Sequence, residues 1–495
     1  MSEISEVRPC IEITDVSFAY AEQEEKSLTD ISLTIYPGET IVFCGTSGCG
    51  KTSLIRLING LTPFYYPGNL EGSVKVLGRE TVAGTIYDMG VTVSTVFQNP
   101  RSQFFCVDVL SELAFGAENR RIPKDEILSR IDRTRAELEL DPFMDRTMFK
   151  LSGGEKQKIA CACVSVTDNP IVVLDEPSSN LDQDATRELK KMILRWKAEG
   201  KTVLIAEHRL EYLKDVADRF YVMKNGRIED GYTAEEFRKF SQEELNRRGL
   251  RTLDYGELEI RNPAGTARGT LELSRVSFRY PREKALSLSI DELTLPKGGV
   301  VGIIGHNGAG KSTFIRNFCG LAGKGKGEYR WDGKKVSPRY RLSHSFLVMQ
   351  DVNHQLFTQS VEEEIELSMG EESEEKLEAI LKAFDLIPFR ERHPMALSGG
   401  QKQRVAVASA VAGNRDVIVF DEPTSGLDYV HMMQVADCIL SLTRQGKTVL
   451  LITHDLELIY AACSHILHLE QGQVKESYPL NGTTEEKLLE FFRKR

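Results

Sequence analysis

The sequence of 495 residues predicts an α/β fold of two domains, each with a mostly parallel sheet at its core. Three observations lead to this expectation. Short apolar runs such as TIVFCG and IVVLDE alternate with amphipathic stretches such as KTSLIRLINGL, which is the order of strands and helices in parallel-sheet folds. A glycine-rich turn stands between the first of these strands and the first helix. The same series of motifs then occurs again in the same order.

The repeat divides the chain into two similar halves. IEITDVSFAY at Ile11–Tyr20 matches LELSRVSFRY at Leu271–Tyr280, and VVLDEPSSNLD matches IVFDEPTSGLD. This period is far longer than that of a solenoid repeat, so a whole domain has been duplicated. We predict domains at residues 11–240 and 270–488, joined by a polar linker at 241–269 that contains at most one short helix.

The composition excludes several classes of protein. The longest apolar runs are well below the roughly 18 residues that a membrane helix needs, and the N-terminal stretch MSEISEVRPC predicts no secretory signal. Nine scattered cysteines fit reduced thiols better than disulfides or zinc sites. The net charge of −10 argues against nucleic acid as a partner. Membrane and protein partners remain open.

Both glycine-rich turns fit the phosphate-binding pattern G-x-x-x-x-G-K-[ST]. Their backbone N–H groups and the positive end of the following helix are expected to hold the phosphates of ATP. Lys51 and Lys311 would reach the β- and γ-phosphates, while the hydroxyls of Thr52 and Ser312 would bind Mg²⁺. The full loops are Gly45, Thr46, Ser47, Gly48, Cys49, Gly50, Lys51 and Thr52, and Gly305, His306, Asn307, Gly308, Ala309, Gly310, Lys311 and Ser312.

An apolar strand in each half ends in two adjacent carboxylates. VVLDE ends in Asp175 and Glu176, and IVFDE ends in Asp421 and Glu422, at the edge where α/β sheets bind ligands. We predict that the aspartates hold Mg²⁺ through water and that the glutamates polarise the attacking water. Phosphoryl transfer needs mainly positioning and charge neutralisation, so these few groups are sufficient.

Two further features complete the series. The next strands, VLIAEH and LLITH, end in His208 and His454, which we predict to be sensors of the γ-phosphate. In LSGGE and LSGGQ, a Ser-Gly-Gly turn begins a helix, so its N–H groups form an anion site without a catalytic group.

Taken together, the phosphate loops, the Asp-Glu pairs, LSGGE and LSGGQ, SNLD and SGLD, and the two histidines resemble the nucleotide-binding domain of ABC transporters, over both halves nearly end to end. The resemblance implies two P-loop NTPase domains of the ABC ATPase kind, each with a mostly parallel sheet core, a β-rich subdomain and a helical subdomain. It also implies that each Ser-Gly-Gly segment meets the γ-phosphate held by the opposite domain. One composite ATP site would combine Gly45–Thr52, Gln98, Asp175, Glu176 and His208 with Ser398, Gly399, Gly400 and Gln401. The other would combine Gly305–Ser312, Gln350, Asp421, Glu422 and His454 with Ser152, Gly153, Gly154 and Glu155.

The same resemblance assigns four more residues. Gln98 and Gln350 would contact Mg²⁺, and Tyr20 and Tyr280 would stack on the adenine rings, worth about 1–3 kcal/mol each by analogy with base stacking. Both sites keep their lysine and glutamate, so we expect two hydrolysing sites. Whether they turn over equally stays open, because Glu155 stands where the usual pattern has glutamine. Cys49 lies inside the first loop, and its alkylation is predicted to block ATP there.

One further pattern indicates the branch of the family. FQNPRSQFF at Phe97–Phe105 and MQDVNHQLF at Met349–Phe357 are followed by helix starts, at Asp108 with Glu112 and at a capping box of Ser360 and Glu363. These stretches, and INGLTPFYYPGNLEGSV after the first phosphate loop, are similar to the ATPases of energy-coupling factor importers. In that group two ATPase domains dock on a membrane-spanning subunit, which pairs with a small substrate-binding membrane subunit.

This resemblance implies a peripheral protein on the cytoplasmic face of the membrane, powering uptake of a vitamin, a vitamin precursor or a transition-metal ion. Phe104, Phe105 and Phe357 would grip the membrane partner. The alternatives are an ATPase of another ABC transporter or, less favoured, a soluble ABC ATPase acting on ribosomes or nucleic acid. The sequence leaves open whether the two domains pair with each other or with a second copy of the chain.

Overall fold

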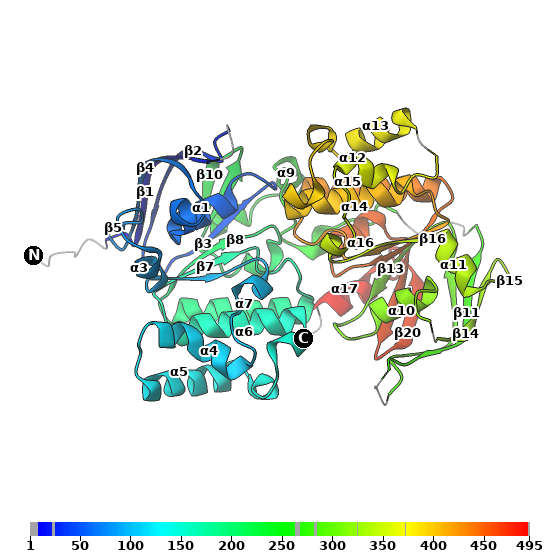
Figure 1. The fold of residues 1–495 in the computed structure, drawn as a ribbon, viewed down its shortest axis with the longest axis horizontal. Helices are drawn as coiled ribbons and strands as arrows, with labels where there is room; N and C mark the ends of the chain where they lie inside the picture. Colours follow the sequence, from blue (N-terminus) through cyan, green and yellow to red (C-terminus); the bar gives the residue numbers. More distant parts are fainter. Residues whose placement is uncertain are drawn as a thin grey trace, which may run out of the picture. The chain divides into compact units, whose positions relative to one another are not determined.

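The computed structural model describes residues 8–21, 25–262, 268–281, 285–323, 325–371 and 373–493. Residues 263–267 of the predicted linker, and a few positions of each predicted domain, therefore lie outside the described residues. The chain separates into two compact units, Met1–Leu253 and Asp254–Arg495, and each is described by itself (Figure 1).

The first unit is built around a six-stranded sheet. Its strand order is β10-β9-β3-β8-β7-β6, with every neighbouring pair parallel except β10 and β9. The predicted strands TIVFCG and IVVLDE are confirmed as β3 and β7. The strands are β3 (Thr40–Gly45), β6 (Val93–Val96), β7 (Ile171–Asp175), β8 (Thr202–Ala206), β9 (Arg219–Lys224) and β10 (Arg227–Thr233).

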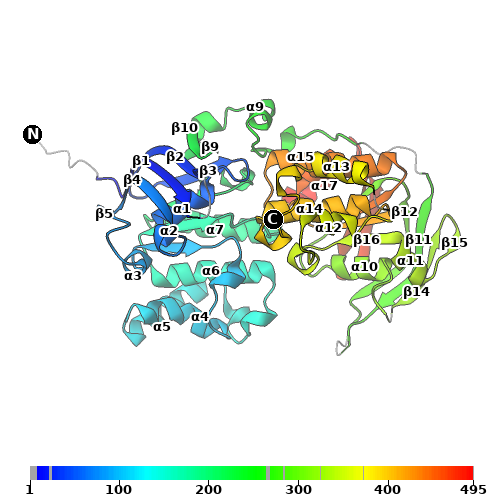
Figure 2. The ribbon, with the colours of Figure 1, turned by 45° about the horizontal axis from the view of Figure 1, so that its top comes forward.

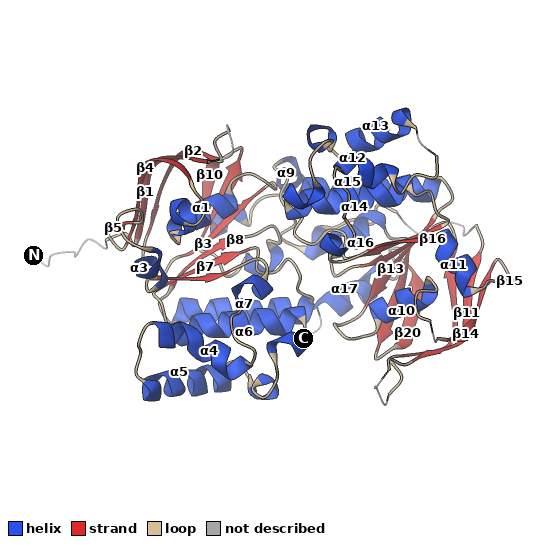
Figure 3. Ribbon diagram, viewed as in Figure 1, coloured by secondary structure: helices blue, strands red, loops and turns tan. Residues whose placement is uncertain are grey.

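Alternate residues of β3 enter two different cores. Ile41 and Phe43 pack with the helix that follows the phosphate loop, whereas Val42 and Cys44 pack in a core with the helices of the opposite face. All four are fully buried, as expected for a central strand covered on both faces. Figure 3 shows these helices flanking the sheet. They are α1 (Lys51–Ile58) on one face, and α6 (Gly153–Thr167) and α7 (Gln183–Ala198) on the other.

Two smaller layers complete the first unit. An antiparallel sheet of order β2-β1-β4-β5 covers the side of α1, and a helical layer of α4 and α5 packs on α6 (Figure 2). The elements are β1 (Ile11–Tyr20), β2 (Leu28–Ile35), β4 (Gly68–Val76), β5 (Arg79–Glu80), α2 (Leu61–Phe64), α3 (Ile86–Gly90), α4 (Val109–Asn119), α5 (Lys124–Glu137) and α8 (Ala234–Phe237).

The second unit repeats this plan. Its large sheet has the order β16-β17-β18-β13-β19-β20, parallel except for β19 with β20, and its antiparallel sheet has the order β12-β11-β14-β15. The strands are β11 (Thr270–Phe278), β12 (Leu288–Pro296), β13 (Val300–Ile304), β14 (Lys326–Trp331), β15 (Lys334–Lys335), β16 (Ser345–Val348), β17 (Val417–Asp421), β18 (Thr448–Ile452), β19 (His465–Glu470) and β20 (Gln473–Pro479). The helices are α10 (Lys311–Phe318), α11 (Pro338–His344), α12 (Val361–Glu366), α13 (Glu374–Ala383), α14 (Gly399–Ala412), α15 (Tyr429–Arg444), α16 (Leu456–Ala462) and α17 (Glu485–Arg493).

The segment predicted to be a linker packs against both units. Its described part contains one short α-helix, α9 (Gln242–Arg247), and a 3-10 turn at Tyr255–Glu257. Leu245, Leu250 and Leu253 are buried in the core of the first unit. Tyr255 and Leu258 pack against the core of the second. No helix in the described part of the chain is long and apolar enough to cross a membrane. The predicted fold, two α/β domains with mostly parallel sheets, each with a β-rich and a helical part, is confirmed.

Candidate functional site

The first phosphate loop connects β3 to α1. Gly45 has a φ of 147°, and a Cβ there would lie 2.1 Å from the carbonyl oxygen of Met223, so only glycine fits. Lys51 is buried, and its ammonium group donates to the carbonyls of Gly45 and Thr46, both at 3.2 Å. The loop therefore presents a cation at its centre, held by carbonyl oxygens that the phosphates of ATP can replace.

The predicted Mg²⁺ ligands of the first unit lie side by side. The hydroxyl of Thr52 donates a 3.0 Å hydrogen bond to Oδ1 of Asp175. Burial and the neighbouring Glu176 raise the pKa of Asp175 to about 6. A hydroxyl and a carboxylate oxygen form the hard-oxygen donor set that Mg²⁺ prefers, and the cation would relieve the cost of burying this carboxylate. These residues fit the ion, and Mg²⁺ bound there would neutralise charge on the phosphates.

Glu176 follows β7 and occupies an unusual backbone position. Its φ is 45°, in the left-handed region that residues other than glycine rarely adopt. Its carboxylate accepts a 2.5 Å hydrogen bond from the side-chain amide of Gln98, and it lies 3.4 Å from Nε2 of His208. That ring nitrogen is also 3.3 Å from Nζ of Lys51. The structure thus brings together the predicted base Glu176, the predicted γ-phosphate sensor His208, the predicted Mg²⁺ contact Gln98 and the phosphate-loop Lys51.

The second unit repeats the arrangement. Nζ of Lys311 donates to the carbonyls of Gly305 at 2.5 Å and His306 at 3.1 Å, and lies 3.1 Å from Nε2 of His454. The hydroxyl of Ser312 donates to Asp421 at 3.3 Å, and Glu422, with a φ of 53°, lies 3.6 Å from Nε2 of His454. Gln350 is exposed and follows β16 by two residues, and its predicted contact with Mg²⁺ stays a prediction. Burial also raises the pKa of Asp421.

Each Ser-Gly-Gly segment begins a helix as predicted. Ser152 caps α6 and Ser398 caps α14, and both form a capping box with the residue three positions on. The carboxylate of Glu155 accepts the N–H of Ser152 at 2.7 Å, just as the amide oxygen of Gln401 accepts that of Ser398 at 2.9 Å. Glu155 therefore performs the same capping role as the usual glutamine.

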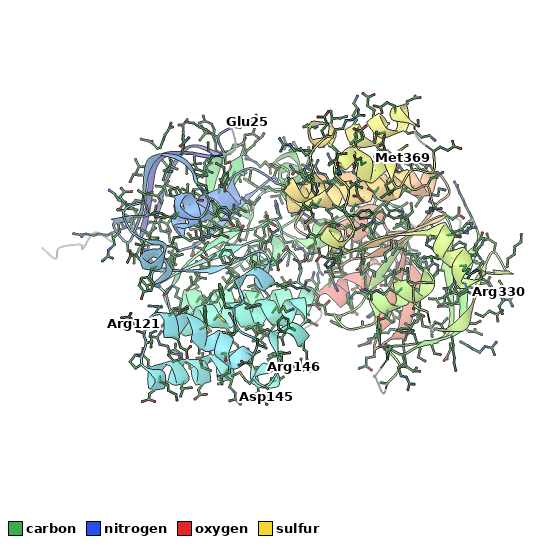
Figure 4. All side chains as sticks on the ribbon, in the orientation of Figure 1. Glu25, Arg121, Asp145, Arg146, Arg330 and Met369 are labelled. Atoms are coloured by element: carbon green, nitrogen blue, oxygen red, sulfur yellow. The ribbon has the colours of Figure 1, made fainter. Side chains whose placement is uncertain are left out.

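The charge of Glu155 has a nearby partner. Arg146, labelled in Figure 4, donates to Oε1 of Glu155 at 3.2 Å. This ion pair reduces the repulsion that an acid at this helix start would exert on a triphosphate. The predicted meeting of each Ser-Gly-Gly segment with the opposite phosphate loop stays a prediction.

The two tyrosines predicted to stack on adenine are anchored to the helices that follow the phosphate loops. The hydroxyl of Tyr20 lies 3.0 Å from that of Ser53 in α1, and the hydroxyl of Tyr280 lies 3.2 Å from that of Thr313 in α10. Both rings are half-buried. This anchoring holds each ring beside its loop, although stacking itself stays a prediction. Cys49 is only 2% exposed, so its predicted alkylation would require the loop to open.

The segment Phe97–Phe105 links the catalytic centre to the surface. Gln98 contacts Glu176 at one end, and the side chain of Gln103 accepts the N–H of Phe97 at 3.2 Å, which closes the loop. The two phenylalanines expected to grip the membrane partner differ in exposure. Phe104 is half-buried and packs against the core, whereas Phe105 is 74% exposed and stacks on Phe115 with ring centroids 5.0 Å apart.

A buried carboxylate holds this loop in place. Glu112 of α4 is 4% exposed, and its Oε2 accepts the N–H groups of Phe105 at 3.0 Å and Cys106 at 2.7 Å. The helix cap is a separate group, because Asp108 accepts the N–H of Ser111. Glu112 and Gln103 were not predicted to have these roles, although both belong to the repeated pattern that singled out the segment.

The second unit has the same loop. Gln355 accepts the N–H of Met349 at 3.0 Å, and the buried Glu364 accepts the N–H groups of Phe357 at 3.0 Å and Thr358 at 3.1 Å. Phe357 is also 74% exposed. The predicted capping box here is wrong in one half: Ser360 accepts the N–H of Glu363, but the carboxylate of Glu363 bonds to the N–H of Gln359 instead.

Comparison with known proteins agrees with this geometry. A family model described as "ABC transporter" matches residues 28–179 and 288–425, more than half of the chain. A protein of Treponema denticola, assigned by name as an ABC transporter ATP-binding protein, is 39% identical over 94% of this chain and 96% of its own length. A protein of Saccharolobus solfataricus with the same kind of name is 30% identical over 94% and 93%.

Solved structures show the same fold. One chain of a structure of ribosome-bound archaeal Pelota and ABCE1 matches 97% of this chain and 80% of its own length, with a TM-score of 0.71 and 21% identity. One chain of the complex of the archaeal ribosomal stalk protein aP1 with the ribosome recycling factor aABCE1 matches 96% of this chain and 92% of its own length, with a TM-score of 0.66 and 21% identity. At this level of identity the likeness shows the fold alone and carries nothing about the task of this chain.

Proposed function

Because this chain belongs to the ABC transporter family of ATP-binding proteins and is an ATPase, we propose that it is the ATP-hydrolysing subunit of a membrane importer of the energy-coupling factor type. Its substrate would be a vitamin, a vitamin precursor or a transition-metal ion. The partners would be a membrane-spanning subunit and a small substrate-binding membrane subunit, which would place the chain on the cytoplasmic face of the membrane.

The observation that carries this proposal is a structural connection through the segment Phe97–Phe105. It joins Glu176, the proposed catalytic glutamate, to the exposed ring of Phe105. Gln98 contacts Glu176, and seven residues later Phe105 stands in solvent, with its own N–H held by Glu112. Rings exposed to this degree on a fixed loop are typical of a protein–protein contact. A partner that moves Phe105 would therefore also move Gln98.

The loop of Phe105 and the neighbouring loop before α6 carry further apolar side chains in the first unit. We define the docking face as Phe105, Val107, Phe115 and Phe149. Val107 and Phe149 are exposed, and the carbonyl of Val107 accepts the N–H of Met148, which brings the two loops together. In the second unit Phe357 and Met395 are exposed at the matching positions of the repeat.

We further propose that ATP closes the two domains head to tail, with Ser152–Glu155 meeting the loop Gly305–Ser312 and Ser398–Gln401 meeting Gly45–Thr52. The capped helix starts at Ser152 and Ser398 support this role, because each presents N–H groups suited to a phosphate. Each domain could pair with the other or with that of a second copy. Hydrolysis would reopen the pair, and the segments at Phe105 and Phe357 would transmit the change.

Co-purification tests the importer role. The tagged full chain, expressed with its neighbouring genes, is isolated from detergent-solubilised membranes, and bound proteins are identified by mass spectrometry. We expect a membrane protein with several spans, lost in Phe105→Ala/Phe357→Ala and retained in Tyr87→Ala, which removes a ring that is 58% exposed and lies outside the stretches that resemble importer ATPases. Association with ribosomes without detergent, unchanged by these substitutions, would instead support a soluble ABC ATPase. The net charge of −10 favours the first outcome.

A further inference from the structure

A buried carboxylate beside the first catalytic centre has no assigned role. Glu207 lies between the end of β8 and His208 and is 1% exposed. Its Oε1 accepts the N–H groups of His208 at 2.7 Å and Arg209 at 3.2 Å. Its Oε2 accepts the N–H of Ser178 at 3.2 Å and the hydroxyl of Tyr212 at 2.9 Å. One side chain thus joins the histidine loop to the loop that follows β7.

These four donors explain how the carboxylate tolerates burial. A carboxylate removed from water needs hydrogen bonds in its place, and here each oxygen accepts two. Burial and the proximity of Glu207 raise the pKa of Tyr212 well above its usual range, so the phenol stays protonated and remains a donor. The guanidinium of Arg209 extends the connection, since it donates to the carbonyl of Leu181 at 3.2 Å.

In the second unit, different residues hold the loop that carries the histidine. Thr453 occupies the position of Glu207, and the acid follows the histidine as Asp455, whose Oδ2 accepts the hydroxyl of Thr424 at 2.8 Å. The backbone N–H of His454 donates to Oε2 of Glu422 at 3.2 Å. In the first unit the equivalent N–H donates to Glu207 instead. The two units therefore differ in which carboxylate receives the amide of the histidine.

We propose that Glu207 is a positioning residue for hydrolysis at the first ATP site. It takes the amide of His208 in place of Glu176, whose carboxylate meets the Gln98 amide at 2.5 Å and the His208 ring at 3.4 Å. It also fixes Ser178, which lies two residues after Glu176 on the same turn. Glu207 acts through these groups and does not touch the phosphates, so its removal lowers turnover and spares ATP binding.

The test uses Glu207→Thr, which installs the residue of the second unit, in the full chain. It is made both in the wild-type background and with Glu422→Gln. If the two ATP sites turn over independently, the Glu422→Gln background silences the second site, so the measured turnover comes from the first. If the two sites are coupled, the wild-type background shows the full effect of Glu207→Thr. The readouts are kcat and KM for ATP, and the equilibrium affinity for ATP in the absence of turnover. Glu235→Thr, on an exposed helix position, is the matched control.

In the background that reports on the first site, which is Glu422→Gln for independent sites and wild type for coupled sites, we expect Glu207→Thr to lower kcat at least tenfold. ATP affinity should change less than threefold, and Glu235→Thr should have no effect. Glu207→Thr/Arg209→Asp places the acid where the second unit has it and should recover at least threefold of the loss, which a merely destabilised protein would not do. If Glu207→Thr does not fold, the isosteric Glu207→Gln is measured instead. It should likewise lower kcat while leaving the ATP affinity nearly unchanged. Unchanged kcat, or a parallel loss of kcat and affinity without recovery in the double variant, would overturn the proposal.

Discussion

The side-chain amide of Gln98 donates a 2.5 Å hydrogen bond to the carboxylate of Glu176. Gln98 follows the end of β6 and Glu176 follows the end of β7, and these two strands are parallel neighbours in the sheet. The bond joins Glu176, which we propose to be the residue that activates water, to a loop whose other end carries the exposed Phe105. A docking partner that moved this loop would change the surroundings of the carboxylate, and this would connect the proposed docking to hydrolysis.

The first prediction concerns the two glutamates after β7 and β17. Glu176→Gln with Glu422→Gln should lower ATP turnover by roughly 10²–10⁴-fold, because a general base is lost. ATP binding should be unchanged, since neither carboxylate is needed to hold the phosphates. Steady-state phosphate release and equilibrium nucleotide binding measure the two effects. Turnover at the wild-type rate in the double variant would refute the assignment of these bases.

The second prediction separates the two adjacent phenylalanines. Phe104→Ala should lower the free energy of unfolding by about 1–3 kcal/mol, because this half-buried ring packs against the core. Phe105→Ala should change it by less than about 0.5 kcal/mol, because the ring is exposed. Urea unfolding of the two variants provides the comparison. Equal losses of stability would mean that Phe105 is part of the core rather than a docking residue.

The third prediction concerns the clamp formed by Glu112. Glu112→Ala leaves the N–H groups of Phe105 and Cys106 without this acceptor, which should lower the free energy of unfolding by about 2 kcal/mol. Glu118→Ala, at an exposed position of the same helix, should have almost no effect. Amide hydrogen exchange should accelerate at residues 105 and 106 in the first variant alone. Slow exchange there after Glu112→Ala would show that the loop is held by other contacts.

Much of the candidate site could be predicted because its residues occupy fixed places in a regular element. Because β7 and β3 belong to one parallel sheet, Asp175 and Glu176 lie at the same sheet edge as the loop after β3. This placement does not depend on the side chains at the protein surface. The orientation of Phe104 and Phe105 could not be predicted in this way, because a loop has no fixed periodicity. The roles of Glu112 and Glu207 depend on backbone N–H groups that only the folded loops bring near them. The contrast of Glu207 with Thr453, visible in the repeat, was the available signal.

The last prediction concerns pH and His468 in β19. This ring is 8% exposed, and Nε2 has no hydrogen-bond partner among the described residues. Burial, and then the charge of Lys475, lower the pKa of His468 below its usual value of roughly 6.5. The unfolded chain therefore binds a proton at a higher pH than the folded one does. The resulting stability is fully present above pH ~6.5 and is lost as the pH falls through the folded-state value, by at most about 1.4 kcal/mol for each pH unit.

The matched variant is His468→Val, because the first unit has the buried Val222 at this position of the repeat. It should reduce the difference in Tm between pH 7.5 and pH 5.5, with the melting of the second unit affected and that of the first unchanged. The remaining difference would come from other groups, including His465, whose pKa burial also lowers. His354→Asn, which replaces an exposed ring, serves as the control. If Tm falls as much on acidification in His468→Val as in the wild type, the acid sensitivity of this unit does not come from His468, the buried ring that packs against Phe491.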